Sequence, residues 1–522
     1  MALVSDSQIW QKLGDYAPDS RLEHLSQLFA DDPSRADRLA IDLGDLYVDF
    51  SRQRVNDSVL ATLIDLAEER EVFPFLQRMA RGERVNVVED RAALHTACRG
   101  TPTADPEVHA QVAACDEQVK TFVDAVRSGT ITASNGRPFR NVISIGVGGS
   151  ELGPLLTLDS LSDSLAQEMT VGVCGNVDGT AYDRAFSGLD MAETLIIVTS
   201  KSFTTLETEM NAARAKAEMQ DAIGDQWASH FVAITANTSA AQAFGIADDR
   251  IFAIWDWVGG RYSIWSAVGM PMALAFGWDA FADLRGGARE IDEHVLSAPI
   301  AENVPIMMAL FSIWNTNFLN ARAEACVPYD TRLRLFSDYL KQLEMESNGK
   351  RVTVSGEEVP YRTQPIVFGG IGSDAQHAFF QQLHQGTDLV ALDFLVFATP
   401  IGNGSNMHNV LTANAIAQAD AMAFGRADRS DMHRYASGNQ PSSVLVYKDL
   451  DARMLGKLIA LYEHKTVAVA RILDINPFDQ WGVQLGKELT GDLEPVFAGG
   501  ESAPNRLRQF VKVFKRMRGD AE

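Results

Sequence analysis

The stretch NVISIGVGGS, residues 141–150, decides the fold class, because it joins an apolar, β-branched run to a glycine loop. Similar runs occur at Thr170–Cys174, 195–199, Phe231–Thr235 and 251–254, and stretches with helical periodicity separate them. Short apolar runs are typical of strands buried on both faces, and strands that alternate with helices form parallel sheets. The sequence therefore predicts a doubly wound α/β unit.

A second set of strand-like runs lies toward the C-terminus. It comprises residues 365–368, 389–397 and 444–447, and a long helical stretch from about 289 to 345 precedes it. That stretch includes the apolar residues 304–319, which two asparagines interrupt, so we expect a buried helix there rather than a membrane span. These patterns predict a second α/β unit with a parallel sheet.

Helical regions flank the two units. Residues 1–108 place apolar side chains at three- and four-residue steps and contain no strand-like run. The segment after residue 451 is helical again. We predict an N-terminal helical region at 1–108, a first α/β domain at 109–288, a second at 289–488 and a C-terminal helical tail at 489–522.

The composition excludes several classes of protein. The 522 residues include 69 Asp and Glu against 46 Lys and Arg, a formal net charge of −23, so we expect no binding to nucleic acid or anionic membranes. The four cysteines are far apart, which favours neither a disulfide framework nor a zinc site and fits a reducing cytoplasm. The first residues lack the pattern of a secretory signal. The basic stretch 506–518 suits a nucleic-acid or membrane element, but its interspersed apolar residues favour a packed helix.

Two loops follow predicted strands and suit an anion. The first, residues 146–150, lacks both the lysine of a Walker loop and the third glycine of a dinucleotide-binding loop. Both anion binding and a simple tight turn stay open for it. The second, residues 200–208, holds five hydroxyl groups and one lysine at a helix N-terminus. N-capping explains one or two hydroxyls but not five, so the second loop predicts a phosphate site.

Four further side chains are candidates for chemistry. Arg261 follows two glycines and suits either a developing oxyanion or a structural ion pair. Glu346 ends a helical pattern and is either a general base or a surface carboxylate. His377 lies seven residues before His384, a spacing that favours proton transfer over a metal site. Lys487 follows a glycine and is either a partly desolvated cation or an ordinary solvated lysine.

Six of these segments together resemble the phosphoglucose isomerase (glucose-6-phosphate isomerase) family. They occur in the family's order between about residues 140 and 490, and they read IGVGGSELGP, SKSFTTLET, GGRYSIWSAVG, MESNGK, AQHAFFQQLHQGT and NPFDQWGVQLGK. The resemblance implies two sugar isomerase (SIS) domains, each a parallel α/β/α sandwich, with helical arms at both ends. It also implies a cytoplasmic, usually homodimeric aldose–ketose isomerase of glycolysis and gluconeogenesis, which needs no cofactor or metal and interconverts glucose 6-phosphate and fructose 6-phosphate.

The resemblance also implies which residues bind the substrate. Those that hold the phosphate group are Ser200, Lys201, Ser202 and Thr205. Those that lie close to the sugar or line the substrate are Gly149, Ser150, Gln342 and Gln480.

The resemblance further assigns the chemistry. It implies that Glu346 transfers the proton between the sugar carbons and that Arg261 steadies a cis-enediolate intermediate. Ring opening is assigned to His377 and Lys487. Two other functions stay open at this point, a sugar-phosphate sensor that does not turn its ligand over and an isomerase that also accepts mannose 6-phosphate.

Overall fold

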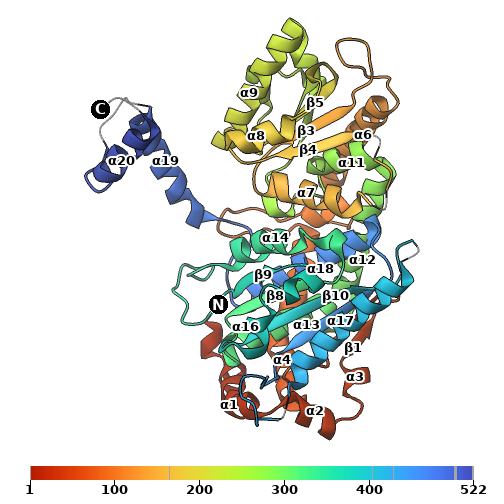
Figure 1. The fold of residues 1–522 in the computed structure, drawn as a ribbon, viewed down its shortest axis with the longest axis vertical. Helices are drawn as coiled ribbons and strands as arrows, with labels where there is room; N and C mark the ends of the chain where they lie inside the picture. Colours follow the sequence, from red (N-terminus) through yellow and green to blue (C-terminus); the bar gives the residue numbers. More distant parts are fainter. Residues whose placement is uncertain are drawn as a thin grey trace. The chain divides into compact units, whose positions relative to one another are not determined.

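The computed structural model describes most of the chain (Figure 1). The described residues are 2–163, 165–167, 169–402, 404–426, 428–498 and 503–519. Their contacts divide the chain into two compact units, Met1–Pro477 and Phe478–Glu522.

Within the described ranges, the first unit contains two sheets, and the first sheet is parallel. Its strands follow the order β4 (Thr170–Cys174), β3 (Asn141–Ile145), β5 (Thr194–Thr199), β6 (Phe231–Thr235) and β7 (Ile251–Ala253). The chain runs from β3 to β4 on one side and then to β5 on the other, so the strand order reverses between β3 and β5. In open α/β sheets, ligands bind beyond the carboxyl ends of the strands at such a reversal.

Helices cover both faces of the first sheet (Figure 1). The helices that pack on one face around Tyr182, Met219 and Ala241 are α8 (Gly179–Phe186), α9 (Leu206–Ile223) and α10 (Thr238–Phe244). The helices that contact strands from the other face are α6 (Pro106–Arg127), α7 (Gly149–Leu161) and α11 (Met270–Phe276). The apolar strands are therefore buried on both sides, as their composition predicts.

The second sheet combines strands from both ends of the chain. Its order is β1 (Ala40–Asp42), β2 (Leu46–Asp49), β11 (Ser442–Tyr447), β10 (Val390–Phe397), β8 (Ala323–Pro328) and β9 (Ile366–Gly369). The strands from β11 to β9 are parallel, whereas β2 is antiparallel to β11 and β1 is antiparallel to β2. The predicted α/β fold with two sheets of parallel strands is confirmed, and the second sheet carries an antiparallel edge.

Two expectations about secondary structure are wrong. Residues 1–108 are not purely helical, because β1 and β2 lie among them. In β2, the buried Leu46 and Val48 alternate with the exposed Tyr47, but the strand is too short for this pattern to be recognised in the sequence. The stretch from 289 to 345 is not purely helical either, because it contains the strand β8. This strand includes a proline and a charged residue, and its place between β10 and β9 is what stabilises it.

Two layers of helices also flank the second sheet. The helices on one face are α15 (Gly372–Gln376), α16 (Phe380–Gln385) and α17 (Ser405–Phe424). The helices on the other side are α12 (Trp278–Ser297), α13 (Val304–Ile313) and α18 (Ala452–Ile472). Helices α12 and α13 both pack against α18. Helix α13 is buried along its whole length and continues into a π-helical turn, Trp314–Phe318, so the expectation of a buried helix at 304–319 is confirmed.

Further helices lie near the two ends of the chain. The helices of the N-terminal region are α1 (Gln8–Leu22), α2 (Leu25–Asp31), α3 (Arg35–Arg38), α4 (Asp57–Glu69) and α5 (Val72–Arg81). The second compact unit contains α19 (Gln484–Phe497) and α20 (Arg508–Arg518). None of the described helices is both long and apolar enough to cross a membrane. The domain boundaries near 108, 288 and 488 stay predictions.

Candidate active site

The loops that follow β3 and β7 touch each other. A Cβ atom added to Gly149 would lie 2.1 Å from the carbonyl carbon of Gly260 and 2.6 Å from the backbone nitrogen of Arg261. Only glycine therefore fits at position 149 without moving the backbone that carries Arg261. The glycine loop is thus both the start of α7 and one wall of the site, and Ser150 lies in the first turn of that helix.

The hydroxyl-rich loop follows β5 and leads into α9. Ser200 Oγ and Thr205 Oγ1 lie 3.2 Å apart, and Thr204 Oγ1 donates to Ser202 Oγ at 2.8 Å. Phe203 has φ 55°, an unusual conformation for a bulky residue, and it turns the backbone between these hydroxyls. The loop therefore gathers hydroxyl groups where the backbone N–H groups of α9 begin, an arrangement suited to an anion.

Lys201 ties this loop to the segment after β7. Its Nζ donates to the backbone carbonyls of Asp256 at 2.9 Å and Val258 at 3.2 Å, and it lies 3.6 Å from Asp256 Oδ1. Burial lowers the pKa of Lys201, and the carboxylate of Asp256 opposes that shift. The loops after β3, β5 and β7 therefore meet at one end of the first sheet.

Arg261 is a buried guanidinium that contacts residues from two other segments of the chain. Its Nη1 lies 3.2 Å from Glu346 Oε2, its Nε donates to Ser347 Oγ at 2.7 Å, and its Nη2 donates to the Pro477 carbonyl at 2.6 Å. The hydroxyl of Tyr262 lies 3.0 Å from Ser347 Oγ. The structure thus brings Arg261 and Glu346 together, and the guanidinium fixes the carboxylate from one side.

A short π-helical segment, η11 (Lys341–Glu346), carries both Gln342 and Glu346. A Cβ added to Gly148 would lie 3.1 Å from Gln342 Nε2, so this amide reaches the glycine loop. Among the described residues, the buried Gln342 Oε1 has no hydrogen-bond partner. The Glu346 side chain is 26% exposed, so its carboxylate is open on the side away from Arg261. Single π-helical turns are frequent at functional sites.

The remaining predicted residues lie elsewhere in the chain. His377 follows α15 in a turn, its backbone N–H donates to the Asp374 carbonyl, and its side chain is exposed. Gln480 and Lys487 belong to the second compact unit, with Lys487 in α19, so the geometry of the first unit does not include them.

The sequence interpretation missed one member of the site, Ser347. Its hydroxyl lies between the side chains of Arg261 and Tyr262, and the residue is fully buried. The segment MESNGK contains this serine, but a serine beside a glycine is equally typical of a turn. Only the partners of the hydroxyl distinguish the two roles.

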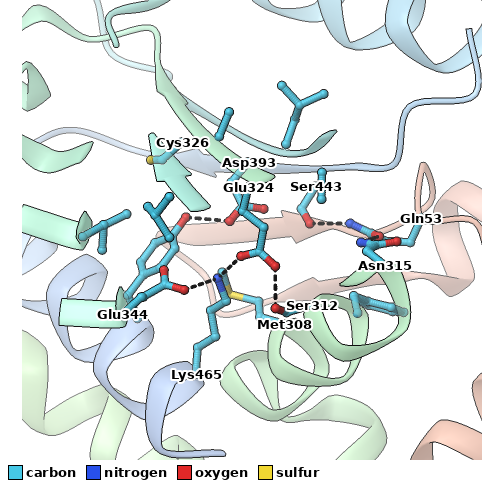
Figure 2. Close-up of a pocket in the computed structure, with 17 residues that line it drawn as sticks. Gln53, Met308, Ser312, Asn315, Glu324, Cys326, Glu344, Asp393, Ser443 and Lys465 are labelled. Atoms are coloured by element: carbon cyan, nitrogen blue, oxygen red, sulfur yellow. Dashed lines mark hydrogen bonds and ion pairs between the residues drawn. The ribbon is translucent and has the colours of Figure 1, made fainter. Parts of the chain in front are cut away.

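A buried charge cluster adjoins η11 on the side of α18 (Figure 2). Lys465 Nζ donates to Glu344 Oε2 at 2.9 Å and to Glu324 Oε2 at 2.7 Å, and Tyr462 donates to Asp393 Oδ2 at 2.9 Å. A cavity of about 30 Å³ lies among these side chains, enough space for a water molecule. We call these residues the Lys465 cluster; it sets one buried cation against the carboxyl groups of Glu324, Glu344 and Asp393.

Burial shifts the titration of Glu344. Burial raises its pKa to about 7, and the nearby Glu324 and Asp393 carboxylates act in the same direction, while Lys465 opposes them. Burial also raises the pKa of Asp393, Tyr462 and Cys326, which line the same cavity. Because its pKa is about 7, Glu344 takes up a proton near neutral pH.

Protonation of Glu344 predicts a pH-dependent stability. Because its pKa is higher in the folded than in the unfolded chain, its contribution is fully present below about pH 4.5 and is lost as the pH rises through 7. We expect the unfolding free energy to fall between pH 5 and 8 by up to about 3 kcal/mol from this group, and the Glu344→Gln variant to fall less. Denaturant titrations at pH 5, 6, 7 and 8 measure both slopes.

The matched control for that experiment is Glu358→Gln, which removes an exposed carboxylate paired with Arg351 at 2.6 Å. This variant should retain the slope of the unmodified chain. Equal slopes in the unmodified chain and Glu344→Gln would show that the proton is not held by Glu344.

The chain is similar to known proteins along nearly its whole length. A family model described as phosphoglucose isomerase matches residues 49–505. A glucose-6-phosphate isomerase of Roseiflexus sp. (strain RS-1) is 43% identical, with 99% of both chains covered. One of Deinococcus deserti is 43% identical, with 98% of this chain and 99% of the relative covered. The crystal structure of a glucose-6-phosphate isomerase from Chlamydia trachomatis is 32% identical with a TM-score of 0.88, covering 98% of this chain and 99% of that one.

The family model and the relatives agree on one family. The family model covers residues 49–505, and the relatives are 43% identical over nearly the full length. The chain belongs to the phosphoglucose isomerase family.

Proposed function

We propose that the chain catalyses the reversible isomerisation of D-glucose 6-phosphate to D-fructose 6-phosphate through a cis-enediolate. The observation that carries this proposal is the buried Arg261 guanidinium 3.2 Å from the Glu346 carboxylate, beside the glycine loop that contains Gly149. A carboxylate that accepts a proton and a fixed cation that stabilises a developing oxyanion are the two groups that an enediolate mechanism requires.

The phosphate group of the substrate binds at the loop after β5. Ser200, Ser202 and Thr205 supply hydroxyl groups, Lys201 supplies a positive charge, and the N-terminus of α9 points its N–H groups toward the same loop. Since the whole chain has a net charge of −23, this local arrangement and not the overall field must attract a dianion.

The sugar lies between the glycine loop and η11. Gly149 and Ser150 border it on one side, and Gln342 uses its unpaired amide oxygen to accept from a sugar hydroxyl. Glu346 takes the proton from C2 and returns it to C1. Arg261 holds Glu346 in place and stabilises the negative oxygen of the intermediate.

Ring opening precedes this transfer and needs a proton donor at the ring oxygen and an acceptor at the C1 hydroxyl. We assign these tasks to His377 and Lys487, with Gln480 as a further contact to the substrate. His377 is exposed in the single chain, and we propose a homodimer in which this residue serves the site of the second subunit. We place the enzyme in the cytoplasm.

A coupled assay with purified protein tests the proposal. We expect turnover of glucose 6-phosphate that persists in the presence of a chelator, because none of the proposed steps uses a metal ion. Tight binding without turnover would contradict the proposal and favour a sensor. A second assay with mannose 6-phosphate determines whether the enzyme accepts the C2 epimer, and loss of activity with the chelator would contradict the cofactor-free mechanism.

A further inference from the structure

Helix α18 holds the segment around η11 at two points. Lys465 donates to Glu344 Oε2 at 2.9 Å, and Asn348 Nδ2 donates to the Thr466 carbonyl at 3.0 Å. Between these two anchors lie Glu346 and Ser347, which contact Arg261 on the other side. The segment is therefore clamped between α18 and the guanidinium. Glu346 lies between the two anchors, and Gln342 lies two residues before the first of them, in the same π-helical turn.

The anchor at Lys465 has three features of a positioning contact. Lys465 and Glu344 are both 3% exposed, so water does not compete for their interaction. Lys465 is itself fixed by Glu324, which also accepts from Ser312 (Figure 2). A π-helical turn is rare and lacks the regular hydrogen-bond pattern of an α-helix, so it depends on contacts from outside the segment.

Loss of this anchor would free the turn to move. Without Lys465, the carboxyl groups of Glu324 and Glu344 would lie buried without a cation. Glu344 would then take up a proton or be displaced, and in both cases it would lose its contact with α18. The cavity of about 30 Å³ beside them gives the side chains space to shift. A displacement of about 1 Å at a catalytic group is enough to lower a rate about 10²-fold.

We propose that Lys465 is a positioning residue for the isomerase, which acts through Glu344 to hold the π-helical turn that presents Gln342 and Glu346 to the sugar. This inference rests on the proposed function for the role of the turn, whereas the contact of Lys465 with Glu344 is independent of it. The assignment adds a residue that touches no substrate and lies on a helix outside all six segments of the family resemblance.

Lys465→Met tests the proposal, with Lys457→Met as the matched control. Lys457 is also a buried lysine of α18, but it pairs with Asp45 and Glu290, away from η11. We expect Lys465→Met to lower kcat by about 10- to 100-fold with KM changed by less than about threefold, because the phosphate loop is untouched. Lys457→Met should retain kcat. Equal kcat values in the two variants would overturn the proposal.

Hydrogen exchange of the residues 341–350 provides a readout that requires no substrate. We expect faster exchange there in Lys465→Met and unchanged exchange in Lys457→Met, since only the first loses a contact with the turn. Unchanged exchange in both variants would overturn the positioning role. If the unmodified chain proved inactive, the proposed function would fail, while this measurement would still decide whether Lys465 orders the turn.

Variants of Glu344 keep the proposal testable if Lys465→Met does not fold. Glu344→Ala should reproduce the loss of kcat, and Glu344→Gln should retain more activity, because its amide oxygen still accepts from Lys465. The double variant Lys465→Met/Glu344→Ala should be no slower than the slower single variant, since both remove the same contact. Additive losses, or a Glu344→Ala variant with full kcat, would contradict an action of Lys465 through Glu344.

Discussion

Replacement of Glu346 with glutamine should lower kcat by at least about 10²-fold and leave KM within about threefold. Glutamine has nearly the same shape, and its amide oxygen still accepts from Arg261, so the site keeps its geometry. The amide cannot take a proton from carbon, so the transfer between C2 and C1 stops. Steady-state kinetics with glucose 6-phosphate gives both constants, and exchange of the C2 hydrogen in D₂O reports the proton transfer directly.

The control for this variant is Glu293→Gln. Glu293 is an exposed carboxylate that pairs with Arg289 at 2.9 Å, so the substitution removes one negative charge and one ion pair away from the site. We expect unchanged kinetics. A Glu346→Gln enzyme with kcat close to that of the unmodified chain, or with continued C2 exchange, would exclude Glu346 as the base.

Replacement of Arg261 with lysine should lower kcat by about 10²- to 10³-fold, although it keeps the positive charge. The guanidinium reaches Glu346, Ser347 and the Pro477 carbonyl with three different nitrogens. A lysine ammonium is a single point and cannot reproduce this fork, so the carboxylate loses its fixed orientation and the developing oxyanion loses a preorganised donor. Kinetics and a thermal unfolding curve of the same preparation separate the effect on rate from the effect on stability.

Arg35→Lys is the matched control for that loss. Arg35 is 2% exposed and donates to two backbone carbonyls, those of Ser51 at 2.7 Å and Gln53 at 2.6 Å, in the N-terminal region. We expect this variant to lose stability and to retain kcat. If both variants lost kcat to the same extent, the effect of Arg261→Lys would be general destabilisation and not a missing contact in the site.

The sequence predicts the first sheet and its loops well, because their signals are local. The run Asn141–Ile145 and the glycines after it lie within ten residues, and so do the hydroxyls after β5. Each pattern indicates a local structure that does not depend on residues far away in the sequence. The meeting of the two loops follows from the strand order, since the carboxyl ends of neighbouring parallel strands lie at one edge.

The parts that the sequence does not predict depend on distant partners. Glu324 makes β8 look unlike a buried strand, and its partner Lys465 lies 141 positions away. The run from Glu463 to Thr466 interrupts an apolar helix with four buried polar residues. This run indicates that polar groups of other segments face the helix. Only the fold shows that Glu344, 121 positions from Lys465, is one of these polar groups.

The pairing of strand β2 has a consequence for the synthesis of the chain. Leu46 pairs with Tyr447 across the sheet, so the hydrogen bonds of β2 to β11 cannot form until the segment about 400 residues later has left the ribosome. At about 5–20 residues per second, this delay is roughly 20–80 s. During that time β2 has an unpaired edge, which invites pairing with other chains. Strand β2 is thus synthesised early but pairs with β11 late, and its unpaired edge has to be protected from other chains during synthesis.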